Sequence, residues 1–284
     1  MKVLVSDALQ PTQFTSDGKY VVETDKKVLL VRKKNAVVSV QYTNGVYEIT
    51  YGKEGKKLLR SSQPIRITPI RADKTVHVIN LELRPAWNLE LNDNTFYNSI
   101  RIVYSEKSQK PLLVNEIGLE RYIRGIAETG GETNVEYIQA LLTAARTYAY
   151  YNILHCSKFP GEPYCLDATA NSQVYKGANY TKRAPLVVAA QRATTHQVIT
   201  YDDTPIIAPY FSHSDGRTRA WSEVWNGDYS WAKSVPDPCC SGMALYGHGV
   251  GMSGEGARYF AERGWDWKQI LYYYYTGVTV KRGY

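Results

Sequence analysis

No apolar run in this chain is long enough to span a membrane. The chain also lacks an internal repeat and a low-complexity tail. It begins with the strand-like MKVLVSDAL rather than with a charged segment and an apolar signal core. We therefore expect either a cytosolic protein or the mature form of an exported one, without a membrane span.

Cysteine is scarce: the four present are Cys156, Cys165, Cys239 and Cys240. An even number suggests disulfides in an exported protein, with three possible pairings. Because a bond between neighbouring cysteines would be strained, we expect one or both of Cys239 and Cys240 to pair with Cys156 or Cys165, with free thiols as the alternative. His155, Cys156 and Cys165 do not have a standard zinc spacing, so no metal and no cofactor is expected, with zinc kept as an alternative.

The net charge of +7 suits an anionic partner such as a cell wall, a nucleic acid or a membrane surface. The basic residues are scattered, with short runs at 26–27, 32–34 and 53–60, and lack interleaved aromatics. A solvated surface therefore explains them better than nucleic-acid binding does. Tyrosine is abundant, with 24 residues against 5 Phe, which suits either β-structure or sugar-stacking surfaces.

The sequence predicts an α+β protein with a β-rich part over 1–110 and a mixed α/β domain over 111–284. Asn44-Gly45 lies between two alternating runs and predicts a hairpin. The expected strands are 2–5, 20–23, 28–32, 36–42, 46–51, 65–70, 76–83, 99–104, 112–115, 197–201 and 206–212.

A buried, Ala-rich helix is expected to begin after Thr133, because apolar residues from Val135 to Ala149 follow the helical period. Thr133 and Glu136 have the spacing of a capping box. A second helix is expected over 185–194. Ser253 predicts the start of a third helix that ends at Gly264, and a capping box at 266–269 predicts a fourth.

Three carboxylates, Glu128, Glu132 and Glu136, lie between the turn at Gly125 and the Ala-rich helix. A carboxylate at such a junction can be an acid catalyst or a helix cap. The capping box gives Glu136 a structural role, so Glu128 and Glu132 remain as candidate acids.

Two motifs are discounted. Residues 249–254 fit G-x-G-x-x-G, but no βαβ unit follows, so close backbone approach explains the glycines better. Ser212, His213 and Asp215 are too close in sequence to form a catalytic triad.

From residue 111 onward the chain resembles the SpoIID/LytB domain family of peptidoglycan lytic transglycosylases. Five ordered blocks carry the resemblance: LLVNEIGLERYIRGIAE, EYIQALLTAARTYAYY, DATANSQVYKG, IIAPYFSHSDGRTRAWSEVW and GHGVGMSGEGARYFAERGWDWKQILYYYYTGV. The acid segment is two residues shorter than the family form, and Gly254, Asp215 and Tyr273 replace the usual Gln, Gly and His.

The resemblance implies Glu128 as the catalytic acid, with Glu132 as the alternative. It implies a substrate-binding set consisting of Arg146, Gln173, Tyr175, Tyr210, Ser212, Ser214, His248, Gly249, Gly251 and Ser253.

The resemblance also implies an extracytoplasmic enzyme that cleaves MurNAc–GlcNAc bonds of glycan strands and leaves 1,6-anhydroMurNAc. A lone acid fits this chemistry because the muramic 6-hydroxyl replaces an enzymic nucleophile. The alternatives are a non-catalytic peptidoglycan-binding protein that activates a cell-wall amidase, and a zinc hydrolase using His155, Cys156 and Cys165.

Overall fold

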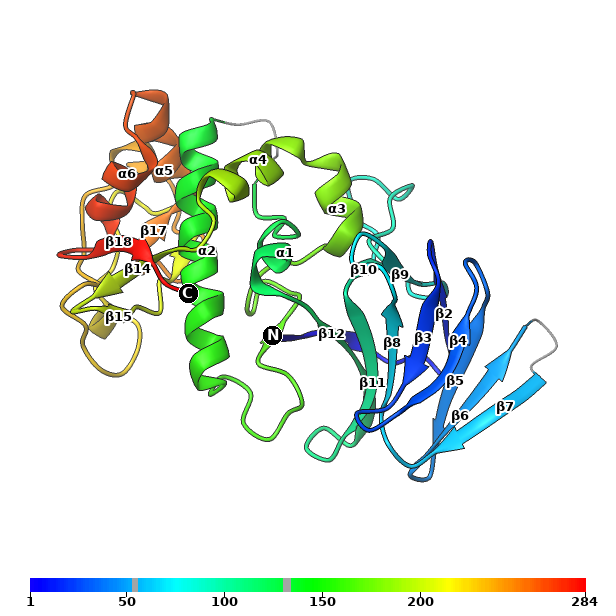
Figure 1. Ribbon diagram of the computed structural model, residues 1–284. Coiled ribbons are helices and arrows are strands. Elements are labelled where there is room, and N and C mark those ends of the chain that lie inside the picture. Colours follow the sequence, from blue (N-terminus) through cyan, green and yellow to red (C-terminus); the bar gives the residue numbers. More distant parts are fainter. Residues whose placement is uncertain (53–55, 130–133) are drawn as a thin grey trace. The chain divides into compact units, whose positions relative to one another are not determined.

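The computed structural model describes residues 1–52, 56–129 and 134–284. The chain forms two compact units: Met1–Ala127 with Cys156–Arg183, and Glu128–His155 with Ala184–Tyr284. Both helices and strands are present (Figure 1), which confirms the α+β class. The division at residue 110 remains a prediction.

The first unit is built on two sheets. The seven-stranded sheet has the order β13-β1-β12-β11-β8-β3-β4, and the six-stranded sheet has the order β10-β9-β2-β5-β6-β7. The strands are β1 (Lys2–Asp7), β2 (Thr12–Ser16), β3 (Tyr20–Glu23), β4 (Val28–Arg32), β5 (Val38–Thr43), β6 (Val46–Tyr51), β7 (Lys56–Ser61), β8 (Ile65–Pro69), β9 (Thr75–Val78), β10 (Thr95–Tyr97), β11 (Ser99–Ser105), β12 (Lys110–Glu116) and β13 (Leu166–Asp167). Two helices, α1 (Leu119–Ile123) and α3 (Gly177–Arg183), complete the unit.

The β5–β6 hairpin turns at Asn44-Gly45, as predicted. Both residues have positive φ, 48° and 80°, which a tight turn between twisted strands requires. Across the unit, Tyr47 of β6 accepts a hydrogen bond from the backbone N–H of Tyr104 of β11 at 2.8 Å. Tyr42 stacks on the Tyr104 ring at 4.7 Å, so tyrosines link the six-stranded sheet to the seven-stranded one.

Tyr175 fixes the turn that follows α1. Its hydroxyl donates to Asn115 Oδ1 at 2.8 Å, and its ring covers Gly125 so closely that a Cβ at 125 would overlap it. The next residues pair with the Tyr175 segment, since the Ala127 N–H donates to the Val174 carbonyl at 2.8 Å. These hydrogen bonds therefore fix the backbone as far as Ala127, the residue before Glu128.

The second unit is organised around α2 (Val135–His155), which α4 (Pro185–Ala193), α5 (Gly254–Glu262), α6 (Trp267–Tyr274) and β14 (Gln197–Tyr201) contact (Figure 1). Ala140, Ala144, Ala145 and Ala149 of α2 are fully buried, and their small side chains let these elements approach. The other elements are β15 (Thr204–Pro205), β16 (Tyr210–Phe211), β17 (Met252–Ser253), β18 (Thr279–Arg282) and the 3-10 turns η1 (Trp221–Glu223) and η2 (Pro238–Cys240).

Asp237 is a buried polar centre of this unit. Its carboxylate accepts hydrogen bonds from Ser214 Oγ at 2.7 Å and from the Tyr274 hydroxyl at 2.8 Å. A Cβ at Gly256 would overlap both the Asp237 carboxylate and the Tyr274 hydroxyl. Residue 256 must therefore be glycine for α5 to lie against this centre.

The predicted caps of the last two helices are confirmed. Ser253 accepts a hydrogen bond from the Gly256 N–H, and Asp266 with Gln269 forms a capping box. α5 ends before Gly264, whose φ of +88° suits the position after a helix.

Two predicted strands are wrong in extent. The 76–83 strand ends at Val78. Beyond that point the Leu81 carbonyl accepts hydrogen bonds from the side chains of Asn92 and Asn94 instead of from a neighbouring strand. The 206–212 strand is reduced to β16 because Ala208 has a φ of 49°, which breaks extended backbone. The prediction missed β2, β7, β10, β13, β15, β17, β18, α1 and α3.

The cysteine prediction is wrong. Cys156 pairs with Cys165, and Cys239 pairs with its neighbour Cys240. Cys156 and Cys165 close a short loop with a Cα–Cα distance of 4.8 Å, which leaves Cys239 and Cys240 to each other. The Cys156–Cys165 disulfide also argues against a zinc site at His155, Cys156 and Cys165, because neither sulfur is then a thiolate that can bind the ion.

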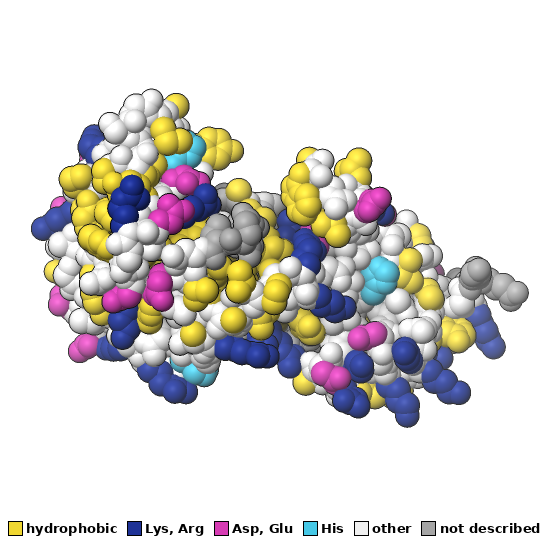
Figure 2. Space-filling model, turned by 90° about the horizontal axis from the view of Figure 1, so that it is seen from above, with side chains coloured by type: hydrophobic (Ala, Val, Ile, Leu, Met, Phe, Trp, Pro, Cys, Tyr) yellow, Lys and Arg dark blue, Asp and Glu magenta, His cyan; other side chains and the backbone are white. Residues whose placement is uncertain are grey.

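Within the described residues, no helix is both long and apolar enough to cross a membrane. On the face drawn in Figure 2, Lys and Arg side chains are spread among Asp and Glu side chains rather than gathered in one field.

We predict that Gly256→Ala lowers the free energy of unfolding by about 1–3 kcal/mol, because the added methyl group must displace Asp237 or Tyr274. Gly118→Ala is the matched control, since nothing lies within 4 Å of a Cβ there, and its change should stay below about 1 kcal/mol. Chemical denaturation followed by circular dichroism measures both. Equal unfolding midpoints for the two variants would contradict the packing described at Asp237.

Alkaline pH is expected to destabilise the protein. Burial raises the pKa of Tyr47 and of Tyr137 to about 12, from 10.0. The unfolded chain releases these protons near the ordinary value, so their contribution is complete below about pH 10 and is lost as the pH rises towards about 12. Denaturation midpoints measured across this range should fall, and they should fall less in Tyr47→Phe. Midpoints that stay constant across this range would count against the burial of these hydroxyls.

Candidate active site

Glu128 and Tyr210 form the centre of the candidate site in the second unit. The Tyr210 hydroxyl donates a hydrogen bond to Glu128 Oε2. Both side chains are half-buried, so the carboxyl group is partly sheltered but can still be reached. A half-buried carboxyl group held by a neutral donor is a suitable arrangement for proton transfer.

The short parallel pairing of β16 with β17 positions Tyr210. Tyr210 lies opposite Met252, and Phe211 lies opposite Ser253. The Pro209 carbonyl accepts from the Met252 N–H at 3.2 Å and from the Tyr275 hydroxyl at 2.7 Å. These bonds fix the strand that carries Tyr210.

The glycines of the 247–254 segment serve this close approach. Gly251 has a φ of +79°, and a Cβ there would overlap the Pro209 carbonyl. Gly249 has a φ of +80°, and a Cβ would press on the Arg219 side chain. The contacts favour backbone packing over a dinucleotide fingerprint, in agreement with the interpretation of the sequence. Neither Gly249 nor Gly251 offers a side chain to a substrate.

Gly254 lies where the resemblance predicts glutamine. A Cβ at 254 would lie 3.2 Å from the Ser212 carbonyl and 3.6 Å from the Tyr137 hydroxyl. Any side chain there would push on the Ser212 backbone. Glycine at 254 therefore keeps Tyr137 and the 211–212 backbone close together.

Tyr137, on the first turn of α2, is part of the site that the sequence did not reveal. Burial raises its pKa to about 12, while Arg258 opposes this change and the charges of Glu255 and Glu128 add to it. Its hydroxyl is therefore protonated at neutral pH. The only sequence signal was its place one residue beyond Glu136, just after the acidic segment.

His248 and Ser212 lie beside the β16 segment that carries Tyr210. The His248 ring contacts Phe211 at 5.6 Å and Trp225 at 4.8 Å, and its Nδ1 accepts from the Val250 N–H at 3.1 Å. Ser212 is exposed, and its Oγ lies 3.2 Å from His213 Nδ1. Asp215 binds Arg219 instead, with oxygen–nitrogen distances of 3.0 and 2.6 Å, which leaves the 212–215 segment without triad geometry.

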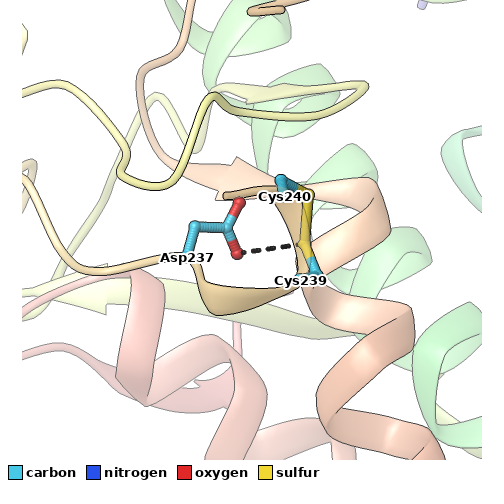
Figure 3. Close-up of side chains that lie close together, drawn as sticks. All are labelled: Asp237, Cys239 and Cys240. Carbon is cyan, nitrogen blue, oxygen red and sulfur yellow. Dashed lines mark hydrogen bonds between the residues drawn. A yellow bond between two sulfur atoms is a disulfide. The ribbon is translucent and has the colours of Figure 1, made fainter. Parts of the chain in front are cut away.

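Ser214 and Ser253 are fully buried and have structural partners. Ser214 donates to Asp237, and Ser253 caps α5. Asp237 also lies beside the Cys239–Cys240 disulfide (Figure 3), with Cys239 Sγ 3.7 Å from Asp237 Oδ1.

Ligand atoms of Asp237, Cys239 and Cys240 lie within 4.8 Å of one another, close enough to share one ion. While the disulfide is intact, however, neither sulfur is a thiolate, and Cys239 has no proton to donate to Asp237. The carboxylate already accepts two hydroxyl donors. The arrangement is that of a packed polar centre.

Arg146 is also fully buried. Its guanidinium donates to Thr194 Oγ1 and to the carbonyls of Gln197 and Gln191 at 3.4 to 3.5 Å. These bonds tie α2 to the end of α4 and to β14. These contacts are structural, and the substrate-binding role that the resemblance implies for Arg146 stays a prediction.

Gln173 and Tyr175 belong to the first unit. Gln173 accepts from the Tyr122 hydroxyl at 3.0 Å, and Tyr175 donates to Asn115. Both side chains are buried, and they hold the turn at Gly125.

Of the other two carboxylates, only Glu136 is described. Its Oε2 accepts a hydrogen bond from the Trp267 N–H at 2.9 Å, so it serves the start of α6, and Asn134 Oδ1 accepts from the Glu136 N–H. Glu132, the alternative acid, and Thr133, the predicted cap, lie outside the described residues.

Part of this chain is similar to known proteins. The sequence model of the SpoIID family (Stage II sporulation protein) matches residues 107–201, which include Glu128. Stage II sporulation protein D of Bacillus amyloliquefaciens is 29% identical over 137 residues, 44% of this chain and 40% of that protein. The protein of the same name from Bacillus subtilis (strain 168) has the same identity and coverage.

An uncharacterized protein of Brachyspira hyodysenteriae is 32% identical over 125 residues, 43% of this chain and 32% of that protein. The match thus covers less than half the length of each relative. Tyr210 and His248 lie beyond residue 201, so the structure, rather than the family match, associates them with Glu128. The chain therefore contains a SpoIID-family domain at residues 107–201.

Proposed function

We propose that the protein is a lytic transglycosylase that cleaves MurNAc–GlcNAc bonds in peptidoglycan glycan strands, with Glu128 as general acid and base. The observation that carries the proposal is the hydrogen bond from Tyr210 to Glu128 in a half-buried site. The SpoIID-family domain around Glu128 supports the same substrate class.

The carboxyl group of Glu128 would carry the proton towards the glycosidic oxygen, while the Tyr210 hydroxyl donates to its Oε2. As the bond between C1 and that oxygen breaks, the proton moves to the leaving sugar. The muramic 6-hydroxyl then attacks C1 and returns its proton to Glu128, so the carboxyl group is restored and a 1,6-anhydro ring is formed.

No second carboxylate is needed as nucleophile in this scheme, unlike in an ordinary two-carboxylate glycosidase. Tyr210 stabilises the carboxylate at the stage when it has lost its proton. His248 and Ser212 lie beside the Tyr210 segment, and we assign them to substrate binding.

An extracytoplasmic location forms part of the proposal. Both cysteine pairs are disulfides, and disulfides persist in oxidising compartments. The net charge of +7 also favours attraction to an anionic wall.

We predict that Glu128→Gln lowers the turnover number by about 100- to 10,000-fold, because glutamine keeps the shape but has no proton to transfer. Release of soluble fragments from dye-labelled peptidoglycan measures it. Glu136→Gln is the matched control, since its carboxylate binds the α6 backbone, and it should retain activity. Wild-type turnover in Glu128→Gln would exclude Glu128 as the acid. Stimulation of a separate amidase by a wild-type protein that releases no fragments would favour the non-catalytic alternative.

Tyr210→Phe should lower the turnover number by about 10- to 100-fold while leaving the KM nearly unchanged. A hydrogen bond to a charged group is worth about 1.5–3 kcal/mol, and this one strengthens when Glu128 becomes ionised. Tyr272→Phe, on the exposed part of α6, is the control. A rise in KM at constant turnover would instead make Tyr210 a substrate-binding group.

A further inference from the structure

An array of aromatic side chains follows β16 in the second unit. Trp221 contacts Trp225 and Tyr229, each with a ring-centroid distance of 4.6 Å, and Tyr229 contacts Trp231 at 5.1 Å. Trp231 is buried, whereas Trp225 and Tyr229 are 36% and 37% exposed. The array thus has a buried base and an exposed edge.

Ring contacts connect this array to the strand that carries Tyr210. Trp225 contacts the His248 ring at 4.8 Å, and His248 contacts Phe211 at 5.6 Å. Phe211 is the neighbour of Tyr210, which binds Glu128. Through His248 and Phe211 the array therefore contacts β16, the strand that carries Tyr210.

The backbone of the array is held in place before any ligand binds. Glu223 accepts two bonds from Arg217, at 3.0 and 2.8 Å, and a third from the Ala220 N–H at 2.8 Å. Trp221 donates through its backbone N–H to Ala232 and through Nε1 to Asn226. Rings that are already ordered lose little conformational entropy on binding.

Two arginines beside the array are paired with carboxylates. Arg217 is paired with Glu223, and Arg219 is paired with Asp215. The pKa values of Glu223 and Asp215 are lowered, in each case mainly by the hydrogen bond from its arginine, so both stay ionised at neutral pH. The array therefore presents neutral aromatic faces with polar edges, which suit the C–H faces of sugar rings.

We propose that Trp225, Trp221 and Tyr229 form a subsite that stacks on pyranose rings of a glycan chain, away from the bond that is cleaved. This inference rests on the proposed function, because the ligand is taken to be the glycan strand bound at Glu128. In this proposal the aromatic array contributes to the affinity for the glycan, and Glu128 catalyses its cleavage.

The test is a binding measurement in the Glu128→Gln background, where cleavage does not interfere. Affinity for glycan strands stripped of stem peptides, and for β-1,4-linked N-acetylglucosamine tetramer, is measured by calorimetry. Trp225→Ala should weaken binding by about 10-fold or more, in the range that loss of an aromatic anchor costs. Trp225→Phe keeps a ring and should restore most of the affinity.

The control is Trp87→Ala, which removes a 75% exposed tryptophan of the first unit and should not change the affinity. Three results would overturn the subsite. They are unchanged binding in Trp225→Ala, an equal loss of affinity in Trp87→Ala, and no binding of either glycan by the Glu128→Gln protein. A loss confined to Trp225→Ala would support the subsite even if the wild-type protein proved to release no fragments. Activity lost in Glu128→Gln with full binding in Trp225→Ala would support the proposed function and reject the subsite.

Discussion

The close contact between the Pro209 carbonyl and the backbone at Gly251 is the constraint on which the second unit depends. The carbonyl accepts from Met252 and from Tyr275, and only glycine fits at 251. The contact pairs β16 with β17, and this pairing fixes Tyr210 next to the Ser253 cap of α5. The position of the Tyr210 hydroxyl on Glu128 follows from backbone packing rather than from side-chain contacts alone.

The buried polar groups near this pairing act as supports. Asp237 joins the Ser214 loop to α6, and Arg146 joins α2 to α4 and β14. Each is fully buried with several partners, which gives a rigid frame. We propose that the exposed or half-buried groups, namely Glu128, Tyr210, Ser212, His248 and Trp225, meet the ligand.

Sequence reasoning succeeded where structure is set by near neighbours. The Asn44-Gly45 hairpin, the Ser253 cap and the 266–269 capping box depend on a few adjacent residues, and each is observed. It failed where distant segments meet. The pairing of Cys239 with Cys240, the end of the strand at Val78 and the place of Tyr137 depend on contacts that no local pattern shows. The burial of Arg146 and Ser214 is likewise not visible in a motif, and their substrate-binding role stays a prediction.

The central claim is that Glu128 acts without an enzymic nucleophile, so the muramic 6-hydroxyl closes on C1. Mass spectrometry of glycan fragments released by the wild-type protein tests this directly. The account predicts muramic ends one water lighter than the hydrolysed form, as a 1,6-anhydro ring requires. Fragments with only hydrolysed, reducing muramic ends would contradict it and would indicate a hydrolase that activates water.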